Sequence, residues 1–488
     1  MISHFATRFA IAGTIFLACS SGGESGEGNG GKSGSGTPPG TIGAGPKDCP
    51  AFTPGNNLSV CAATYVTGPG EDKAGGIAIA NDGAILYVGS LAEDYPGATT
   101  TGLPGGSAGL LRLTADGQKV QTVARLGSTA TDIDIQPRSG HMVVAGDFGV
   151  QVLNPTADGS LFHWKEMPTR KVAAGSDGII VALSGKTIVV LDNLGKEKAR
   201  FDVSTNREVN DIAIDGQNRL IFATGFKQDD GAPCTQLQIP FVRAYDYTGA
   251  LKWKAYDWSR TEVGSECADS RGIALALGAD GQLYYAGESH GGNTVHRRMP
   301  RDITVFAPNV KTDAYNDAYN MNGAAPVGYV ARLSPTTGDV TMGQIFLTRL
   351  SNGKGNAARP NVVAANEAGT VLIGGSAACC IENAAMRTVN GQPAMPEGTY
   401  AGGGFALVLQ TDFKKRLAWT TWNGAKGGGA TPAGVAARGG TMAIVMQHAP
   451  TNDGKAQPTS AAPLITDNAL ATDHGGTTDA FVSVWTSP

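Results

Sequence analysis

The chain has 488 residues and a formal net charge of −4 at pH 7, with 42 acidic residues against 38 Lys and Arg. Charged residues make up 16% of the sequence, below the roughly 25% usual in soluble domains, and Gly occurs 69 times. No basic cluster is present, which argues against a nucleic-acid partner. An apolar content of 41% excludes a wholly disordered chain.

The N-terminal residues are expected to be an export signal rather than part of the fold. Residues 9–18 form an apolar run that is too short to span a membrane as a helix. The run leads into Phe16-Leu-Ala-Cys19, which resembles a bacterial lipobox, although lipoboxes usually have Leu in place of Phe16. We predict a signal peptide over residues 1–18, a lipid on Cys19 and a disordered Gly/Ser-rich tether over residues 19–46. The alternative is an ordinary cleaved secretory peptide.

From about residue 75 the sequence repeats a β-hairpin pattern. One copy is an alternating apolar strand, a Gly turn and a second apolar strand, and it reads Ile77-Ala-Ile-Ala-Asn-Asp-Gly-Ala-Ile-Leu-Tyr-Val-Gly89. Similar copies begin at Asp211 and Gly272, and each copy is followed by a second hairpin such as Gly109–Ala124. One unit is therefore four antiparallel strands. Repeats of this size predict an array of such units.

Seven units follow one another, starting at about residues 75, 131, 171, 210, 271, 360 and 433. The seventh has three recognisable strands, and residues 58–66, which precede the first unit, supply a fourth. We therefore predict an all-β fold over residues 47–488, a seven-bladed β-propeller of four-stranded antiparallel blades. In this fold the N-terminal strand closes the last blade, which removes the exposed sheet edges that an open array would leave.

Cysteines beyond the lipobox are even in number, which in an exported chain indicates disulfides. Cys49 and Cys61 are close in sequence, and a bridge between them would fix the tether to the closing strand. Cys234 lies between the second and third strands of the fourth unit, and Cys267 lies between the fourth and fifth units. Because these two connections emerge on the same face of an antiparallel sheet, we predict a Cys234–Cys267 disulfide.

Cys379 and Cys380 are adjacent in the sequence and are the most unusual local feature. A vicinal disulfide between them would form a strained ring, and strained disulfides tend to be labile or functional. We favour this bond because the other four cysteines pair plausibly without them. Separate bridges to distant partners, or two buried thiols, are the alternatives.

The connections between the second and third strands are tight in units two and three and long elsewhere. The long ones are residues 91–108, 227–240, 288–327, 377–402 and 447–478. All of them leave from the same face as the connections between units. Insertions gathered on one face usually mark a binding face, with tolerated decoration as the alternative.

Charged residues stand at or near the starts of the first strands, on that same face. The candidate binding residues are Asp132, Asp211, Asp269, Arg271 and Arg359, together with His290 and His448 from the insertions and the pair Cys379 and Cys380. The charged side chains form either a mixed-charge funnel for a ligand or a ring that pairs with itself, and the frequency of structural ion-pair networks favours the second. No His-x-His or His-x-x-x-His spacing occurs, so we predict no metal site.

Several phrases recur around the array: Gly76-Ile-Ala-Ile and Leu86-Tyr-Val-Gly-Ser in unit one, Gly328-Tyr-Val-Ala-Arg-Leu333 in unit five and Gly476-Thr-Thr-Asp-Ala-Phe-Val482 in unit seven. In these phrases the repeat resembles the bacterial SBBP-type β-propeller repeat. The resemblance covers nearly all of the chain after the tether, although units two and three depart from the pattern. It implies a cell-surface or secreted propeller and carries no catalytic residues to transfer.

We predict a binding or interaction module rather than an enzyme, with no catalytic residues and no cofactor. The expected protein is a monomeric lipoprotein of the bacterial cell envelope, at the outer membrane or cell surface, that binds a protein or polysaccharide. The alternatives are a purely structural envelope component and a quinoprotein-like oxidoreductase. Two features suggest the oxidoreductase: the vicinal cysteines, and the phrase Asp246-Tyr-Thr-Gly-Ala-Leu-Lys-Trp253, which resembles a quinoprotein blade motif but is convincing only once.

Overall fold

The computed structural model describes residues 46–66, 71–101, 103, 105–232, 234–312, 325–378, 381, 386–394, 403–422, 429–449, 464–472 and 478–488. The chain divides into the units Met1–Gly40 and Thr41–Pro488, and all the described residues belong to the second. The predictions for the signal peptide, for Cys19 with the tether up to residue 45, and for Cys379 and Cys380 lie outside the described residues.

The structure is all-β, and we number its seven larger sheets 1 to 7 in chain order. Sheet 1 contains β3 (Ala74–Ile79), β4 (Ile85–Ser90), β6 (Ala108–Leu113) and β7 (Val120–Gly127). Sheet 2 contains β8 (Ala130–Ile135), β9 (Met142–Gly146), β10 (Gly149–Leu153) and β11 (Ser160–Trp164). Sheet 3 contains β12 (Lys171–Ala174), β13 (Ile180–Ser184), β14 (Thr187–Leu191) and β15 (Glu197–Asp202).

The next three sheets repeat this antiparallel order. Sheet 4 contains β16 (Glu208–Asp215), β17 (Leu220–Asp230), β18 (Gln236–Asp246) and β19 (Leu251–Ala255). The short helix α1 (Arg260–Val263) follows it. Sheet 5 contains β20 (Ser270–Leu277), β21 (Leu283–Ser289), β25 (Val327–Leu333) and β26 (Val340–Phe346). Sheet 6 contains β29 (Ala358–Ala365), β30 (Val371–Ala377), β33 (Gly403–Leu409) and β34 (Arg416–Thr420).

Sheet 7 takes its fourth strand from the N-terminal part of the chain. Its strands are β35 (Gly429–Arg438), β36 (Thr441–Ala449), β37 (Asp479–Thr486) and β2 (Ala62–Tyr65). Strands β2 and β37 are antiparallel, with Ala62 opposite Val484 and Tyr65 opposite Phe481. The strand expected over residues 58–66 is shorter than predicted, because β1 (Asn57–Leu58) pairs instead with β31 (Thr388–Val389).

The insertions add small elements to this framework. They are β5 (Thr99–Thr100), η1 (Val295–Arg297), β22 (Arg298–Met299), β23 (Asp302–Phe306), β24 (Val310–Lys311) and β32 (Gln392–Pro393), and β27 (Thr348–Arg349) and β28 (Gly355–Asn356) connect sheets 5 and 6. The long loop predicted over residues 227–240 is wrong. Strands β17 and β18 stay paired out to Asp230 opposite Gln236, because backbone pairing continues beyond the region of apolar alternation.

The core lies between neighbouring sheets. Sheet 2 packs against sheet 3 through residues such as Val143 and Val189, and sheet 3 packs against sheet 4 through residues such as Val181 and Ile221. The middle strands are covered on both faces, so β9, β10 and β14 are nearly continuous apolar runs rather than alternating ones.

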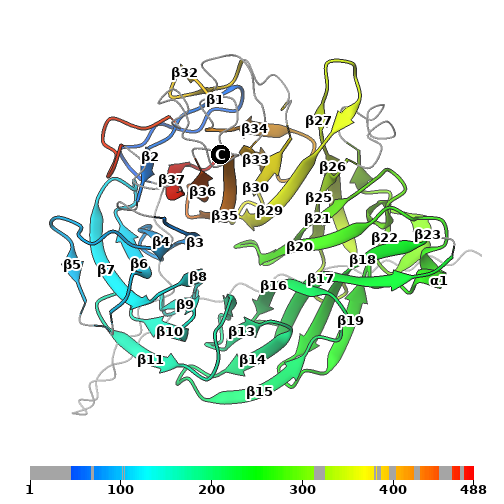
Figure 1. Ribbon diagram of the computed structural model, residues 1–488, viewed down its shortest axis with the longest axis horizontal. Coiled ribbons are helices and arrows are strands. Elements are labelled where there is room, and N and C mark those ends of the chain that lie inside the picture. The colour runs from blue at the N-terminus through cyan, green and yellow to red at the C-terminus, as the bar shows by residue number, and fades with distance from the viewer. Residues whose placement is uncertain are drawn as a thin grey trace, which may run out of the picture. The chain divides into compact units, whose positions relative to one another are not determined.

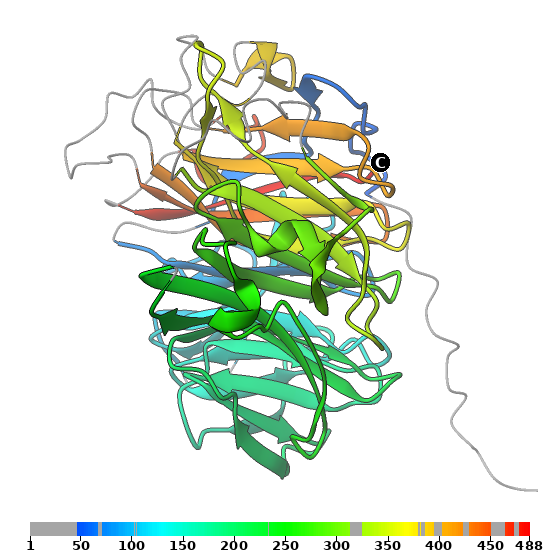
Figure 2. The ribbon, with the colours of Figure 1, turned by 90° about the vertical axis from the view of Figure 1, so that its right-hand side faces the viewer.

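The first strands of neighbouring sheets contact one another in an unbroken cycle. Strand β3 contacts β8, and the contacts continue through β12, β16, β20, β29 and β35 back to β3. In Figure 1 these strands lie on the inside of the arrangement and the fourth strands, such as β11 and β15, lie on the outside. Figure 2 shows the same sheets after a 90° turn, with their strands running across the view.

Acidic side chains join the free edges of these first strands. Asp132 and Asp134 of β8 each accept a hydrogen bond from a backbone N–H of β12, at Val172 (2.9 Å) and Ala174 (2.8 Å). Asp211 of β16 accepts one from the N–H of Leu275 in β20 at 2.9 Å. A first strand has no further strand on this side, so the carboxylates satisfy backbone donors that would otherwise lack a protein partner.

The free energy of unfolding should depend on the titration of Asp134. Burial raises the pKa of Asp134 to about 7, although the N–H groups of Ala174 and Ile135 lower it and the charge of Asp132 adds to the rise. A carboxyl whose folded pKa lies above its unfolded value stabilises the fold when protonated, so this contribution is lost as the pH rises from about 4 to about 7. We expect Asp134→Asn to gain stability relative to the parent over that range, by about 1.4 kcal/mol per unit of pKa difference.

Urea unfolding followed by Trp fluorescence at pH 4.5 and pH 7.5 measures this difference. Asp202→Asn, at an exposed position in β15, is the control and should follow the parent at both pH values. If the free energy of unfolding changes equally with pH in the parent and in Asp134→Asn, the raised pKa of Asp134 is contradicted.

Candidate functional site

Glu288 is the point at which three of the predicted binding residues meet. Its Oε1 lies 3.2 Å from Arg271 Nη1 and 3.4 Å from His290 Nε2, and its Oε2 lies 3.8 Å from Arg359 Nε. Arg271 and Glu288 are directly opposite each other on β20 and β21, whereas Arg359 comes from β29 of sheet 6. We call these four residues the Glu288 cluster.

The cluster buries its carboxylate and leaves the basic side chains around it partly exposed. The Glu288 side chain is 4% exposed, while those of Arg271, His290 and Arg359 are 30%, 24% and 44% exposed. Burial alone would raise the pKa of Glu288, but the hydrogen bond with His290 and the charges of Arg359 and Arg271 bring it below its ordinary value. Glu288 is therefore ionised at neutral pH and is the counter-charge of Arg271 and Arg359.

Arg271 is positioned from sheet 4 as well as from sheet 5. Its Nε donates to Gln238 Oε1 on β18, and its guanidinium lies over the Phe226 ring at 5.2 Å from the centroid. Asp269 bonds to the backbone of two of these residues. Its carboxylate accepts from the Gln238 N–H at 2.9 Å, and its carbonyl accepts from the His290 N–H at 2.7 Å. The predicted residue Asp269 thus orients the cluster.

The predicted residues Asp132 and Asp211 belong to a separate set. Lys171 Nζ lies 3.5 Å from Asp132 Oδ1 and 3.8 Å from Asp211 Oδ1. Burial lowers the pKa of Lys171, but the two carboxylates more than reverse this and hold the pKa above its ordinary value. With their backbone N–H partners, these groups pair among themselves and join sheets 2 to 5.

His448 lies away from both sets. The prediction that it belongs to the insertion 447–478 is wrong, because β36 stays paired with β35 as far as Ala449. The His448 side chain is buried at 2% exposure, and its Nδ1 lies 2.8 Å from the hydroxyl of Tyr65 on β2. This contact ties the N-terminal strand to the interior of sheet 7.

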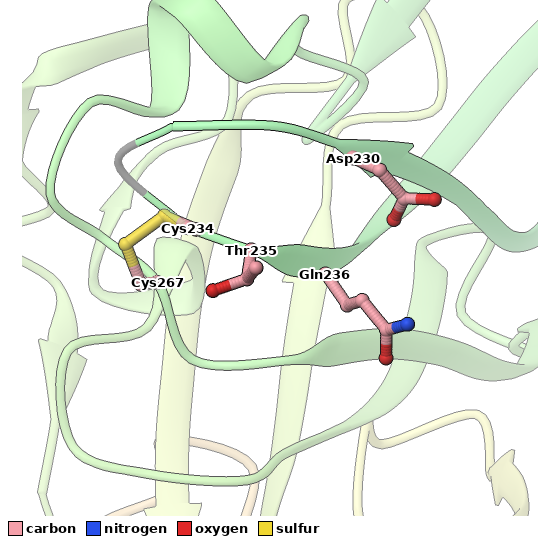
Figure 3. A pocket seen from close by; sticks show the side chains of 5 residues that line it. All are labelled: Asp230, Cys234, Thr235, Gln236 and Cys267. Carbon is pink, nitrogen blue, oxygen red and sulfur yellow. A yellow bond between two sulfur atoms is a disulfide. The ribbon is translucent and has the colours of Figure 1, made fainter.

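Both predicted disulfides between described cysteines are present. The Cα atoms are 5.0 Å apart in Cys49–Cys61 and 5.4 Å apart in Cys234–Cys267. The second disulfide borders an open cleft of about 720 Å³ that we call the disulfide cleft. Figure 3 shows the residues that line it: Asp230, Cys234, Thr235, Gln236 and Cys267.

The disulfide cleft adjoins the Glu288 cluster. Gln236 lines the cleft, and Gln238, two residues further along β18 and on the same face of the strand, accepts from Arg271. Cys267 also lines the cleft, and Asp269, two residues later, accepts from the N–H of Gln238. Gln238 and Asp269, which hold the cluster, are thus each two residues away from a residue of the cleft lining.

Sequence reasoning missed Glu288, Lys171 and Gln238, which complete the two charged sets. Glu288 follows the apolar stretch Leu283–Gly287 and was expected to open the insertion 288–327 rather than to lie buried. A charged residue at the end of an otherwise apolar strand was the available signal. For Lys171 and Gln238 the partners lie on other sheets, so no local pattern pointed to them.

Comparison with known proteins does not add a family to this description. No protein-family model matches the chain, and the search of curated proteins finds no match. Within the described ranges, no helix is both long and apolar enough to cross a membrane. Among those same residues, no three His, Cys, Asp or Glu side chains are grouped as a metal site would require. The candidate site therefore rests on its own geometry.

Loss of the Glu288 charge should destabilise the protein. Glu288→Gln leaves two arginines without their counter-charge, and we expect a loss of about 1–3 kcal/mol in the free energy of unfolding at pH 7. Because the folded pKa of Glu288 is lowered, its contribution is present above the unfolded pKa near 4.5 and is lost as the pH falls below that value. The difference in the free energy of unfolding between the parent and Glu288→Gln should therefore be smaller at acidic pH.

Denaturant unfolding at pH 7 and at pH 3.5 tests this expectation. Glu197→Gln is the matched control, since Glu197 forms an exposed ion pair with Arg200, and it should change stability by less than about 0.5 kcal/mol. A Glu288→Gln variant as stable as this control at pH 7 would show that Glu288 does not hold the cluster together.

Proposed function

We propose that the chain is a seven-bladed β-propeller whose insertion-bearing end binds a partner at the bacterial cell envelope, without catalysis. Three observations support the propeller: seven antiparallel sheets of similar strand order, the cycle of contacts between their first strands, and the N-terminal strand in sheet 7. The likeness of the repeat to SBBP-type propellers agrees with this architecture.

The observation that carries the binding function is the Glu288 cluster. Arg271, His290 and Arg359 come together from two sheets around one buried carboxylate, yet their side chains remain partly exposed. The contact from Glu288 to Arg359, at 3.8 Å, is too long for a hydrogen bond, and a partly exposed ion pair of this kind adds little to stability. Partly exposed basic side chains on a rigid β framework instead suit recognition of a partner.

Export and lipid anchoring belong to the same proposal. Disulfides persist mainly in oxidising compartments, and the Cys49–Cys61 and Cys234–Cys267 bridges agree with an exported protein. A lipid on Cys19, followed by the Gly/Ser-rich segment, would hold the sheets near a membrane and leave the insertion-bearing end free to meet a partner.

The quinoprotein-like alternative gains no support from the phrase that suggested it. The Trp253 indole N–H donates to the carbonyl of Pro335 at 3.0 Å, and a Cβ at Gly338 would lie 2.6 Å from the same ring. The phrase thus places a tryptophan of sheet 4 against the turn between β25 and β26 of sheet 5. We assign it a packing role.

Binding to envelope material tests the proposed function. The purified chain should sediment with cell envelopes from the producing bacterium in a saturable manner, and Arg359→Glu should reduce the bound fraction at least fivefold. Deletion of the whole insertion 288–327 is a poorer test, because Val295 and His296 within it are buried. Arg200→Glu on the outer strand β15 is the control, and equal loss with both variants, or no binding by the parent, would refute the proposal.

The mass of the mature N-terminus tests the anchor. If Cys19 is lipidated, intact-mass analysis of the membrane fraction will show a chain that starts at Cys19 and carries acyl groups. Cys19→Ser should then move the protein into the soluble fraction. A parent protein that starts elsewhere without a lipid would leave an ordinary secreted protein.

A further inference from the structure

Arg359 has hydrogen-bonding capacity that the fold does not use. Its one ion pair in the described part of the chain is with Glu288, at 3.8 Å from Nε, and its side chain is 44% exposed. A guanidinium presents paired N–H donors in a plane, which is the geometry that binds a carboxylate with two hydrogen bonds. The outward nitrogens of Arg359 are therefore suited to an anionic group from solution.

A second, buried arginine lies behind the disulfide cleft. Arg260 is 8% exposed, and its Nη1 donates to the carbonyl of Cys234 at 3.0 Å. Among the residues that the structure describes, it forms no ion pair, and its Nη2 has no hydrogen-bond partner. A buried charge without a counter-ion acts over a longer range than a solvated one, so Arg260 favours negative charge in a ligand that enters the cleft.

The lining of the cleft is suited to hydroxyl groups. Asp230, Thr235 and Gln236 offer a carboxylate, a hydroxyl and an amide, which together accept from and donate to neutral polar groups. None of the large exposed apolar side chains of the described chain, which are Leu161, Leu194, Leu251, Val305, Phe306 and Met386, belongs to the cleft lining. A ligand rich in hydroxyls therefore fits better than an apolar peptide.

The cleft and the cluster are spaced for one extended ligand. Gln236 and Gln238 are about 7 Å apart along β18, and the second of them holds Arg271. A chain that places hydroxyls in the cleft would bring its next units to Arg271 and Arg359. Of the acidic groups nearby, Glu288 contacts Arg271 and Arg359, and Asp269 accepts from the N–H of Gln238. Asp230 accepts from Gln228 Nε2 through one carboxylate oxygen, and its other oxygen is an acceptor for ligand hydroxyls in the cleft.

We infer that the Glu288 cluster and the disulfide cleft together bind an acidic polysaccharide, with ligand carboxylates on Arg359 and Arg271 and ligand hydroxyls on the cleft lining. The inference rests on the proposed binding function and adds the chemical class of the partner. Sugars that bear carboxylates carry both kinds of group that this surface is suited to bind. Their carboxylates match the arginines, and their hydroxyls match the polar lining of the cleft.

Polygalacturonate is the probe for this inference, and its fully methyl-esterified form is the matched control polymer. Calorimetric titration of the parent should give saturable binding of the acid form and a loss of at least tenfold in affinity for the ester. Arg359→Gln should weaken binding at least tenfold, and Arg359→Lys should be intermediate because it keeps the charge but loses the paired donors. Thr235→Ala should weaken binding by twofold to fivefold, and Arg200→Gln should leave it unchanged.

Three results would overturn the inference. They are equal binding of the acid and ester polymers, unchanged binding by Arg359→Gln with an unchanged melting temperature, and binding of polyglutamate but not of polygalacturonate. The last would indicate an acidic protein as the partner. If envelopes still bind the parent while polygalacturonate does not, the inference fails and the proposed function stands; if neither binds, both fail.

Discussion

The free edge of each first strand is the constraint on which the structure depends. A four-stranded sheet leaves one row of backbone N–H and C=O groups at each edge without a strand partner. Asp132, Asp134 and Asp211 supply acceptors across the gap to the next first strand. Asn210 supplies a donor in the same way, since its Nδ2 donates to the Gly272 carbonyl at 2.6 Å. These side chains fix the offset of one sheet from the next without merging the sheets into one.

The candidate site inherits its geometry from that offset. Its bonds cross from one sheet to another: Gln238 of sheet 4 to Arg271 of sheet 5, and Glu288 of sheet 5 to Arg359 of sheet 6. Register shifts also influence the geometry of the site. One residue near the start of each of three first strands is unpaired: Asn210 in β16, Ile273 in β20 and Asn361 in β29. A bulge turns the following side chains, so the ends of these strands are directed differently from their interiors.

The sequence was sufficient for what depends on local pattern. Alternating apolar residues and Gly turns gave the strands, and the order of antiparallel strands placed Cys234 and Cys267 on one face, where the disulfide is found. It was insufficient where pairing continues through polar residues, as in the extension of β17 and β18, or where a strand runs further than expected, as at His448. The role of Glu288 depends on Arg359, which is far away in sequence and was placed only by the packing of sheet 6 on sheet 5.

Charged residues near the starts of the first strands have different roles, which depend on their chemistry and on their place relative to the bulge. Asp132 and Asp211 directly follow the unpaired residue of their strands. Arg271 and Arg359 stand two residues before it. An aspartate at the free edge of a first strand accepts a hydrogen bond from a backbone N–H of the next first strand, as Asp132 and Asp211 do. An arginine can also bond to the backbone of the next first strand, since Arg170 donates to the carbonyl of Asn210 at 3.0 Å. Arg271 and Arg359 instead turn to the side chains of Gln238 and Glu288, which engage part of each guanidinium. The aspartates and Arg170 thus join neighbouring sheets through their backbones, whereas Arg271 and Arg359 keep guanidinium donors outside the backbone pairing of sheets 5 and 6.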